Sequence, residues 1–175
     1  MYSIESFDYM EDERVQVVEL PYKGDELSML VVLPKSKEAA AMQKLIANLS
    51  TAQINKWTER LESKEIFLNM PKFKLEQIYK MESILTEMGM PIAFSNKADF
   101  SLFNDKLPLA VDSVIHKAVV EVDEKGTVAA AATSIVITPI SASYNAEFTA
   151  DHPFMFMIKD NKTDAILFLG QVNKL

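Results

Sequence analysis

The sequence predicts an α+β fold, because segments with strand and helix character both recur along its 175 residues. Three observations lead to this prediction: two adjacent strands within residues 14–34, three helical segments between residues 38 and 89, and a strand hairpin across residues 154–172. Hydrophobic residues make up 49% of the chain and charged residues 25%, as in ordinary globular proteins. The length suits one domain or two small ones, and the composition excludes disorder for most of the chain.

The first two strands are predicted on either side of a turn at residues 21–25. Residues 15–20 partly alternate between apolar and polar side chains, whereas residues 27–33 form an almost continuous apolar run. Such a run predicts a strand that is buried on both faces. Residues 65–76 also look extended, and Pro71 within them indicates an edge strand or a bulge.

Helices are predicted over residues 38–47, 50–61 and 81–88. The second begins with the spacing of a capping box and holds Trp57, which we expect to be a core anchor rather than a ligand contact. The third carries methionine and aliphatic side chains at intervals of three and four residues, which predicts core packing. Gly89 follows it at the place of a C′ glycine.

A further strand is predicted over residues 113–124, and the terminal hairpin is expected to turn at residues 160–163. His116 lies on the apolar face of the predicted strand. A core histidine with a satisfied hydrogen bond is therefore favoured over a catalytic or metal-binding one.

Composition and motifs exclude several classes of function. A net charge of −7 argues against nucleic-acid binding, and no apolar run approaches the ~18 residues of a membrane helix. The chain has no cysteine and two histidines, and it lacks a glycine-rich phosphate loop and a Gly-x-Ser-x-Gly motif. We therefore expect no enzyme activity, no metal and no cofactor.

Residues 126–146 contain no charged side chain and include four successive alanines. One interpretation is a buried strand followed by a turn, although alanine has little strand propensity. The other is a segment that is a loop in one state and a central sheet strand in another, because small neutral residues enter a sheet without a clash or a buried charge. Alternation along that strand would place one set of residues on the same face: Thr127, Ala129, Ala131, Thr133, Ile135 and Ile137.

Insertion of such a segment into a sheet would release a large free energy. About 10 residues would gain ladder hydrogen bonds of ~0.5–1.5 kcal/mol each, and each buried large aliphatic side chain adds ~1.5–3 kcal/mol. The gross gain is on the order of 10–20 kcal/mol, before an ordering cost of ~1–2 kcal/mol per residue. Whole domains are stable by only ~5–15 kcal/mol, so a loop kept out of its sheet would store a comparable free energy.

Five segments resemble the serpin family and occur in the same order: residues 19–24, 94–100, 116–119, 121–133 and 148–158. The fourth, EVDEKGTVAAAAT, is similar to the hinge of the family, and the fifth, FTADHPFMFMI, to its C-terminal signature. The resemblance implies a serpin fold, in which mixed and antiparallel β-sheets pack with helices, and covers only the C-terminal half. Residues 1–175 would then form a partial serpin domain with a reactive-centre loop at about 125–147.

The resemblance also implies a function, the inhibition of a serine protease by a suicide mechanism. The protease cuts the loop and is trapped as an acyl-enzyme when the loop inserts into the main sheet. The family pattern places the reactive bond at Ile140–Ser141, with Ile137, Ala142 and Tyr144 as alternative positions, and makes His116 the shutter histidine. The implied hinge consists of the following residues: Glu124, Gly126, Thr127, Ala129, Ala130, Ala131, Ala132 and Thr133.

The residues around this bond indicate the class of target protease. A β-branched aliphatic side chain at Ile140 suits the pocket of an elastase- or chymotrypsin-like enzyme. No lysine or arginine occurs from Gly126 to Ala150, which disfavours trypsin-like targets.

The resemblance covers only the C-terminal half of a serpin, and this supports an alternative function. The chain would be a non-inhibitory serpin-fold binding protein, or an inactive half-chain that needs a second chain or the missing N-terminal half. An extracellular location is expected, although residues 1–5 lack the basic start and apolar core of a signal peptide. Asn48 and Asn161 begin Asn-x-Ser/Thr sequons and are candidate glycosylation sites, with chance occurrence as the alternative.

Overall fold

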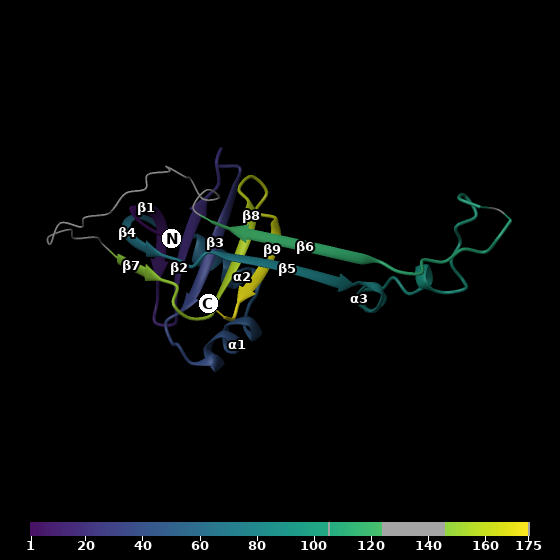
Figure 1. Cartoon of the computed structure of the whole chain (residues 1–175), viewed down its shortest axis with the longest axis horizontal. Helices are drawn as coiled ribbons and strands as arrows, with labels where there is room; N and C mark the ends of the chain where they lie inside the picture. Colours follow the sequence, from purple (N-terminus) through teal and green to yellow (C-terminus); the bar gives the residue numbers. More distant parts are fainter. Residues whose placement is uncertain (105, 124–145, 175) are drawn as a thin grey trace. The chain divides into compact units, whose positions relative to one another are not determined.

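The computed structural model describes residues 1–104, 106–123 and 146–174 (Figure 1). It divides into two compact units, of which the first comprises Met1–Phe73 and Val122–Leu175 and the second Lys74–Glu121. Among the helices of the described ranges, none combines the length and the apolar character that a membrane span requires.

A seven-stranded sheet forms the first unit, in the order β7-β4-β1-β2-β3-β8-β9. All neighbours pair antiparallel except β7, which runs parallel to β4. The strands have these bounds: β1 Tyr2–Glu11, β2 Val15–Pro21, β3 Leu27–Pro34, β4 Glu62–Asn69, β7 Ala146–Thr149, β8 Phe154–Asp160 and β9 Ile166–Val172. The predicted strand pair and the terminal hairpin are confirmed, whereas β1 and β7 were not predicted.

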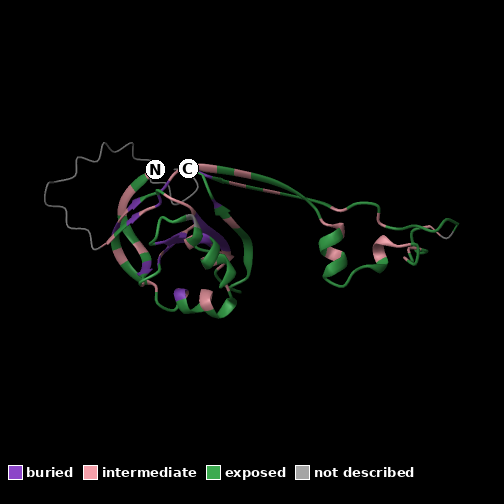
Figure 2. Ribbon diagram, turned by 90° about the horizontal axis from the view of Figure 1, so that it is seen from below, coloured by how far each residue is buried: buried purple, intermediate pink, exposed green. Residues whose placement is uncertain are grey.

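Both faces of the sheet centre are buried (Figure 2). On one face, helices α1 (Ala39–Ala47) and α2 (Thr51–Thr58) contribute Met42 and Trp57 to a core cluster with side chains of β1, β2, β3 and β8. On β3, every residue from Ser28 to Pro34 is buried, as the apolar run predicts. The Ser50 hydroxyl accepts a hydrogen bond from the Gln53 amide at 3.2 Å, which confirms the predicted cap of α2.

The second unit contains β5 (Phe73–Lys80), helix α3 (Glu82–Glu87), the 3₁₀ turn η1 (Ile92–Phe94) and β6 (Ile115–Val122). β5 and β6 form a two-stranded sheet. Ion pairs across this sheet join Lys74 to Glu121 and Glu76 to Lys117. The later residue of β5 thus pairs with the earlier residue of β6, so the two strands are antiparallel.

Gly89 ends α3 as predicted. Its φ of +101° is one that a residue with a side chain rarely adopts. Its amide donates to the carbonyl of Thr86, and the amide of Met90 donates to that of Leu85. These two bonds form the Schellman motif that commonly closes a helix.

Residues 65–76 are largely extended, as predicted, but they belong to two strands in different sheets. Pro71 lies between these strands and not within an edge strand or a bulge, because the chain leaves β4 after Asn69 and proline lacks the amide that a ladder needs. Contrary to the prediction, the methionine stripe of α3 is not buried, and Met88 is 77% exposed. None of the described residues of the second unit is buried, since a two-stranded sheet has too little surface to bury a face alone.

We expect the substitution Gly170→Ala to destabilise the protein by about 1–3 kcal/mol. Gly170 on β9 faces Phe156 on β8, and an added Cβ would lie 2.6 Å from the Cζ atom of that buried ring. Urea unfolding of the variant measures the change. Gln171→Ala, at the exposed neighbouring position, is the control and should leave the free energy of unfolding within about 0.5 kcal/mol. Equal stabilities of the Gly170 variant and the unaltered chain would contradict this packing.

Candidate functional site

Most of the site residues that the sequence predicts lie in residues 124–145, outside the described residues, and they remain predictions. The predicted hinge is one such set: Glu124, Gly126, Thr127, Ala129, Ala130, Ala131, Ala132 and Thr133. The predicted reactive-bond positions are another: Ile137, Ile140, Ser141, Ala142 and Tyr144. The structure does describe the strand before this segment, β6, and the strand after it, β7, each in its own unit.

The upstream strand, β6, does not bury its histidine. His116 is exposed, and its ring stacks on that of Tyr79 with centroids 6.2 Å apart. The expected core histidine is thus not observed, because none of the described residues of the second unit forms a layer over β6. A hydrogen bond from Lys74 to Glu121 joins β5 to β6 and raises the pKa of Lys74. The shutter role of His116 remains a prediction.

The downstream strand, β7, is short and lies at the edge of the seven-stranded sheet. Four residue pairs join it to β4, from Ile66 and Ala146 to Asn69 and Thr149. The side chain of Phe148 is fully buried. Ala146 and Glu147, the last two residues of the expected loop at 125–147, therefore belong to a strand.

A glutamine from β2 provides a further contact to β7. Gln16 Nε2 donates one hydrogen bond to the carbonyl oxygen of Glu147 and one to Tyr9 Oη, each at 2.8 Å. Tyr9 is 1% exposed, and burial raises its pKa to about 12, so its phenol stays neutral at physiological pH. The position of the glutamine is fixed in turn by this buried hydroxyl.

The chain that leaves β7 is held by a second polar network. His152 Nδ1 lies 2.7 Å from Asp151 Oδ1, and its Nε2 lies 2.5 Å from the carbonyl oxygen of Pro34 at the end of β3. Lys37 Nζ lies 2.5 Å from the other carboxylate oxygen of Asp151. The hydrogen bonds from His152 and Lys37 lower the pKa of Asp151 to about 2. The sequence did not predict this network, because Lys37 lies 114 residues before Asp151 and Pro34 lies 118 residues before His152.

One cavity of about 330 Å³ lies elsewhere in the first unit, between the hairpin turns. Its lining consists of Ser6, Phe7, Asp8, Glu19, Pro21, Asp25, Ser28 and Asn161. The Ser28 hydroxyl, 1% exposed, lies 2.5 Å from Glu19 Oε1 and 2.7 Å from Asn161 Oδ1. Lys159 Nζ lies 3.1 Å from the same Glu19 oxygen and neutralises it. The hydroxyl has one hydrogen and can donate to only one of these two oxygens. Among the described residues no cluster suits a metal ion.

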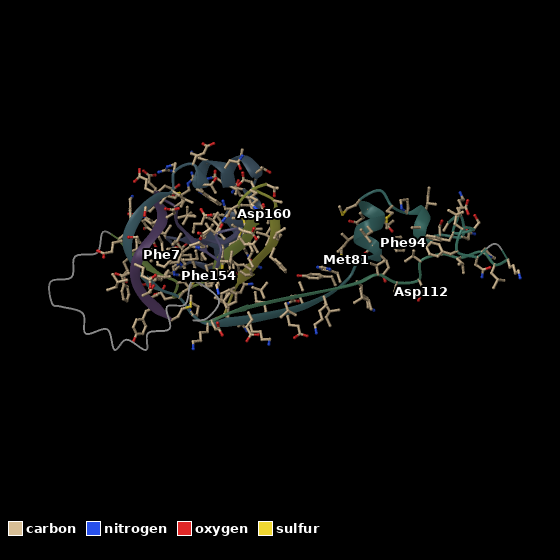
Figure 3. All side chains as sticks on the ribbon, turned by 90° about the horizontal axis from the view of Figure 1, so that it is seen from above. Phe7, Met81, Phe94, Asp112, Phe154 and Asp160 are labelled. Carbon is tan, nitrogen blue, oxygen red and sulfur yellow. The ribbon has the colours of Figure 1, made fainter. Side chains whose placement is uncertain are left out.

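Both candidate glycosylation residues use their side-chain amides within the protein. Asn161 follows Asp160, which ends β8 (Figure 3), and its Nδ2 donates to the carbonyl of Asp25 at 2.9 Å. Asn48 follows α1, and its Nδ2 donates to the carbonyl of Lys44 at 2.7 Å. Both residues are exposed, and their modification remains a prediction.

Known proteins are similar to this chain in sequence and in fold. The whole chain, residues 1–175, matches a family model described as "Serpin (serine protease inhibitor)". Serpin B4 of Homo sapiens is 42% identical over 173 residues, which cover 97% of this chain and 44% of the relative. Leukocyte elastase inhibitor of Homo sapiens is 39% identical over 171 residues, which cover 95% and 45%. Uncleaved ovalbumin superposes with a TM-score of 0.82 at 30% identity, over 100% of this chain and 44% of its own.

The chain thus spans less than half the length of the curated relatives it matches. The expectations of an extracellular location and of N-glycosylation gain no support from these relatives.

The low pKa of Asp151 predicts a pH-dependent effect of the substitution Asp151→Asn. The pKa falls from about 3.9 in the unfolded chain to about 2 in the folded one, so the carboxylate stabilises the fold above about pH 4. This stabilisation is lost as the pH falls towards 2. The variant should therefore be less stable than the unaltered chain at pH about 7, and the difference should shrink in acid.

Urea unfolding at a series of pH values measures this effect. Glu13→Gln, which removes an exposed carboxylate between β1 and β2, is the control and should change stability little at any pH. A destabilisation by Asp151→Asn that is the same at neutral and acid pH would contradict the assignment.

Proposed function

The chain belongs to the serpin family, and from this premise we propose that it is part of a serine protease inhibitor that acts by a suicide mechanism. Its sheets and helices have the serpin fold and correspond to the C-terminal portion of the family. One observation supports the proposal most: the neutral, small-residue segment from Gly126 leads directly into β7, which several independent contacts hold on the sheet.

The proposed reactive-centre loop is the segment at about 125–147, and the proposed reactive bond is Ile140–Ser141. A protease that attacks the carbonyl of Ile140 would form an acyl-enzyme with it and release the amino group of Ser141. The part that follows Ser141 would stay on the sheet through β7. The part that precedes the bond, from Gly126 onwards, would be free to insert as a strand because it holds no charge.

We propose an elastase- or chymotrypsin-like target. The aliphatic side chain at position 140 and the absence of lysine and arginine from Gly126 to Ala150 support this class. The name of one relative, leukocyte elastase inhibitor, points the same way.

A second candidate is a half-chain that functions only together with further polypeptide. Exposed apolar side chains on the edge strand β9 favour it: Ile166, Leu167, Phe168 and Leu169 are 39–57% exposed. Apolar surface of this extent on an edge strand is a liability unless something covers it. The 175 residues alone would then not trap a protease.

We expect the intact protein to form a detergent-resistant complex with elastase or chymotrypsin, visible on a denaturing gel. Thr127→Arg should abolish the complex and leave clean cleavage, because a charged side chain cannot enter the sheet. Thr127→Val, of similar size and without charge, is the matched control and should keep the complex. The released fragment should begin at Ser141. Clean cleavage of the unaltered protein, or an unchanged complex with the arginine variant, would refute the insertion mechanism.

Cleavage of the loop should raise the melting temperature if the loop inserts, because the cut segment gains the ladder bonds and burial of a sheet strand. Calorimetry before and after limited proteolysis measures the shift. The 175-residue chain should show no rise if it is a half-chain that needs a partner. A rise in the isolated chain would exclude that second candidate.

A further inference from the structure

Gln16 joins two strands of the sheet that are not neighbours. The strand order is β7-β4-β1-β2, so β4 and β1 lie between β7 and the strand that carries Gln16. The side-chain amide of Gln16 nevertheless donates to the carbonyl oxygen of Glu147 on β7 at 2.8 Å. Among the described strands β7 pairs only with β4, through four residue pairs. The glutamine therefore gives a short edge strand a second attachment to the sheet, which does not depend on its ladder.

A buried tyrosine fixes the direction of this amide. Gln16 lies opposite Glu11 of β1, so Tyr9 is its diagonal neighbour on that strand. The Tyr9 hydroxyl, on a side chain that is 1% exposed, accepts the other N–H of the amide at 2.8 Å. A glutamine amide has two donor hydrogens, and both are used here. Because the contact with Tyr9 already orders the side chain, the bond to β7 costs little further conformational entropy.

We propose that Gln16 is a positioning residue, which keeps β7 on the sheet and thereby shields the peptide bond that follows Phe148. The side chain of Phe148 is fully buried while β7 is paired. Proteolysis of such a bond needs local opening, and its rate follows the population of the open form when opening and closing are fast. Loss of the bond from Gln16 raises that population, because β7 has few other contacts to keep it closed.

The consequence for inhibition rests on the proposed function. A chymotrypsin-like protease has a hydrophobic pocket for the residue before the cut, and the aromatic side chain of Phe148 suits it as well as residues of the proposed loop do. A cut after Phe148 would compete with the cut at Ile140–Ser141. By keeping β7 closed, Gln16 favours attack on the proposed reactive bond over attack on the strand that follows it.

Hydrogen–deuterium exchange of the full chain tests this role. Gln16→Met keeps the length of the side chain but removes both donors. We expect the protection factors of the backbone amides in residues 146–150 to fall by about twofold to tenfold, which is the effect of one lost hydrogen bond. Unchanged protection of these amides would overturn the proposal. The measurement needs no trapped protease, so its failure is distinguishable from the failure of the proposed function.

Two control variants separate this role from a general loss of stability. Glu147→Gln should leave the protection of β7 unchanged, because Gln16 bonds to the backbone carbonyl and the Thr149 hydroxyl can donate to either side chain. Gly170→Ala, on the strand at the opposite edge of the sheet, should lower overall stability without opening β7. A fall in β7 protection in either control as large as that in Gln16→Met would overturn the proposal.

A variant of the tyrosine covers the case in which Gln16→Met does not fold. Tyr9→Phe removes only the hydroxyl that fixes the amide, so we expect a smaller fall in the protection of β7. Both substitutions together should have the effect of Gln16→Met alone, because the hydroxyl acts on β7 through the glutamine. Unchanged protection in Tyr9→Phe, or effects that add in the double variant, would overturn the proposal.

Limited proteolysis with chymotrypsin measures access to the bond after Phe148 directly. The fragment that begins at Thr149 should form about twofold to tenfold faster in Gln16→Met, whereas cuts after residues 137–144, which precede β7, should keep their rates. Equal rates for the Thr149 fragment in both proteins would overturn the proposal. A faster Thr149 fragment in a chain that forms no detergent-resistant complex would support the role of Gln16 and count against the suicide mechanism.

Discussion

Burial of both faces of β3 is the constraint on which the rest of the described structure depends. Its sequence LSMLVVLP contains no charge, and its residues from Ser28 onwards are buried. A strand of this kind needs a layer on each side and a neighbour on each edge. Helices α1 and α2 provide one layer, while Phe73, which packs on Phe154 and Phe156, contributes to the other face. β2 and β8 pair with its edges.

The strands away from this centre are less buried than β3, and the two edge strands differ in the contacts that hold them. β9 is as long as its neighbour β8 but leaves a row of apolar side chains exposed. β7 has only four residues, yet it buries Phe148 and receives polar contacts from β2 and from the end of β3. The edge that continues the proposed reactive loop is therefore the one with side-chain contacts from distant parts of the chain.

The sequence allowed prediction of the elements that local pattern determines. The apolar run of β3, the cap at Ser50 and the closing glycine at Gly89 each act over a few residues, and all three occur as expected. β1 and β7 were missed because β1 mixes charged with apolar residues and β7 is short, so each is defined mainly by its partner strands. Burial of α3 was wrongly predicted because an amphipathic pattern shows which face is apolar, not what covers it.

The site was predictable only in part, for the same reason. The family motifs predict the loop, whereas the contacts that hold the strand after it, β7, join residues that are far apart in sequence. Gln16 and Glu147 are 131 residues apart, and His152 and Pro34 are 118 apart. Neither polar pair is visible as a pattern in the local sequence, because each contact depends on which strands become neighbours in the sheet.

The turn between β2 and β3 and the turn between β8 and β9 support each other. Asn161 donates from its side chain to Asp25 and from its backbone to Glu26, and the Ser28 hydroxyl lies against its side-chain oxygen. Most surface hairpins accept extra residues at their tips at small cost in free energy. Here a lengthened tip in either hairpin would displace the groups that form hydrogen bonds with the other turn. The two turns must therefore keep their lengths together, and a change in one over evolution would have to be matched by a change in the other.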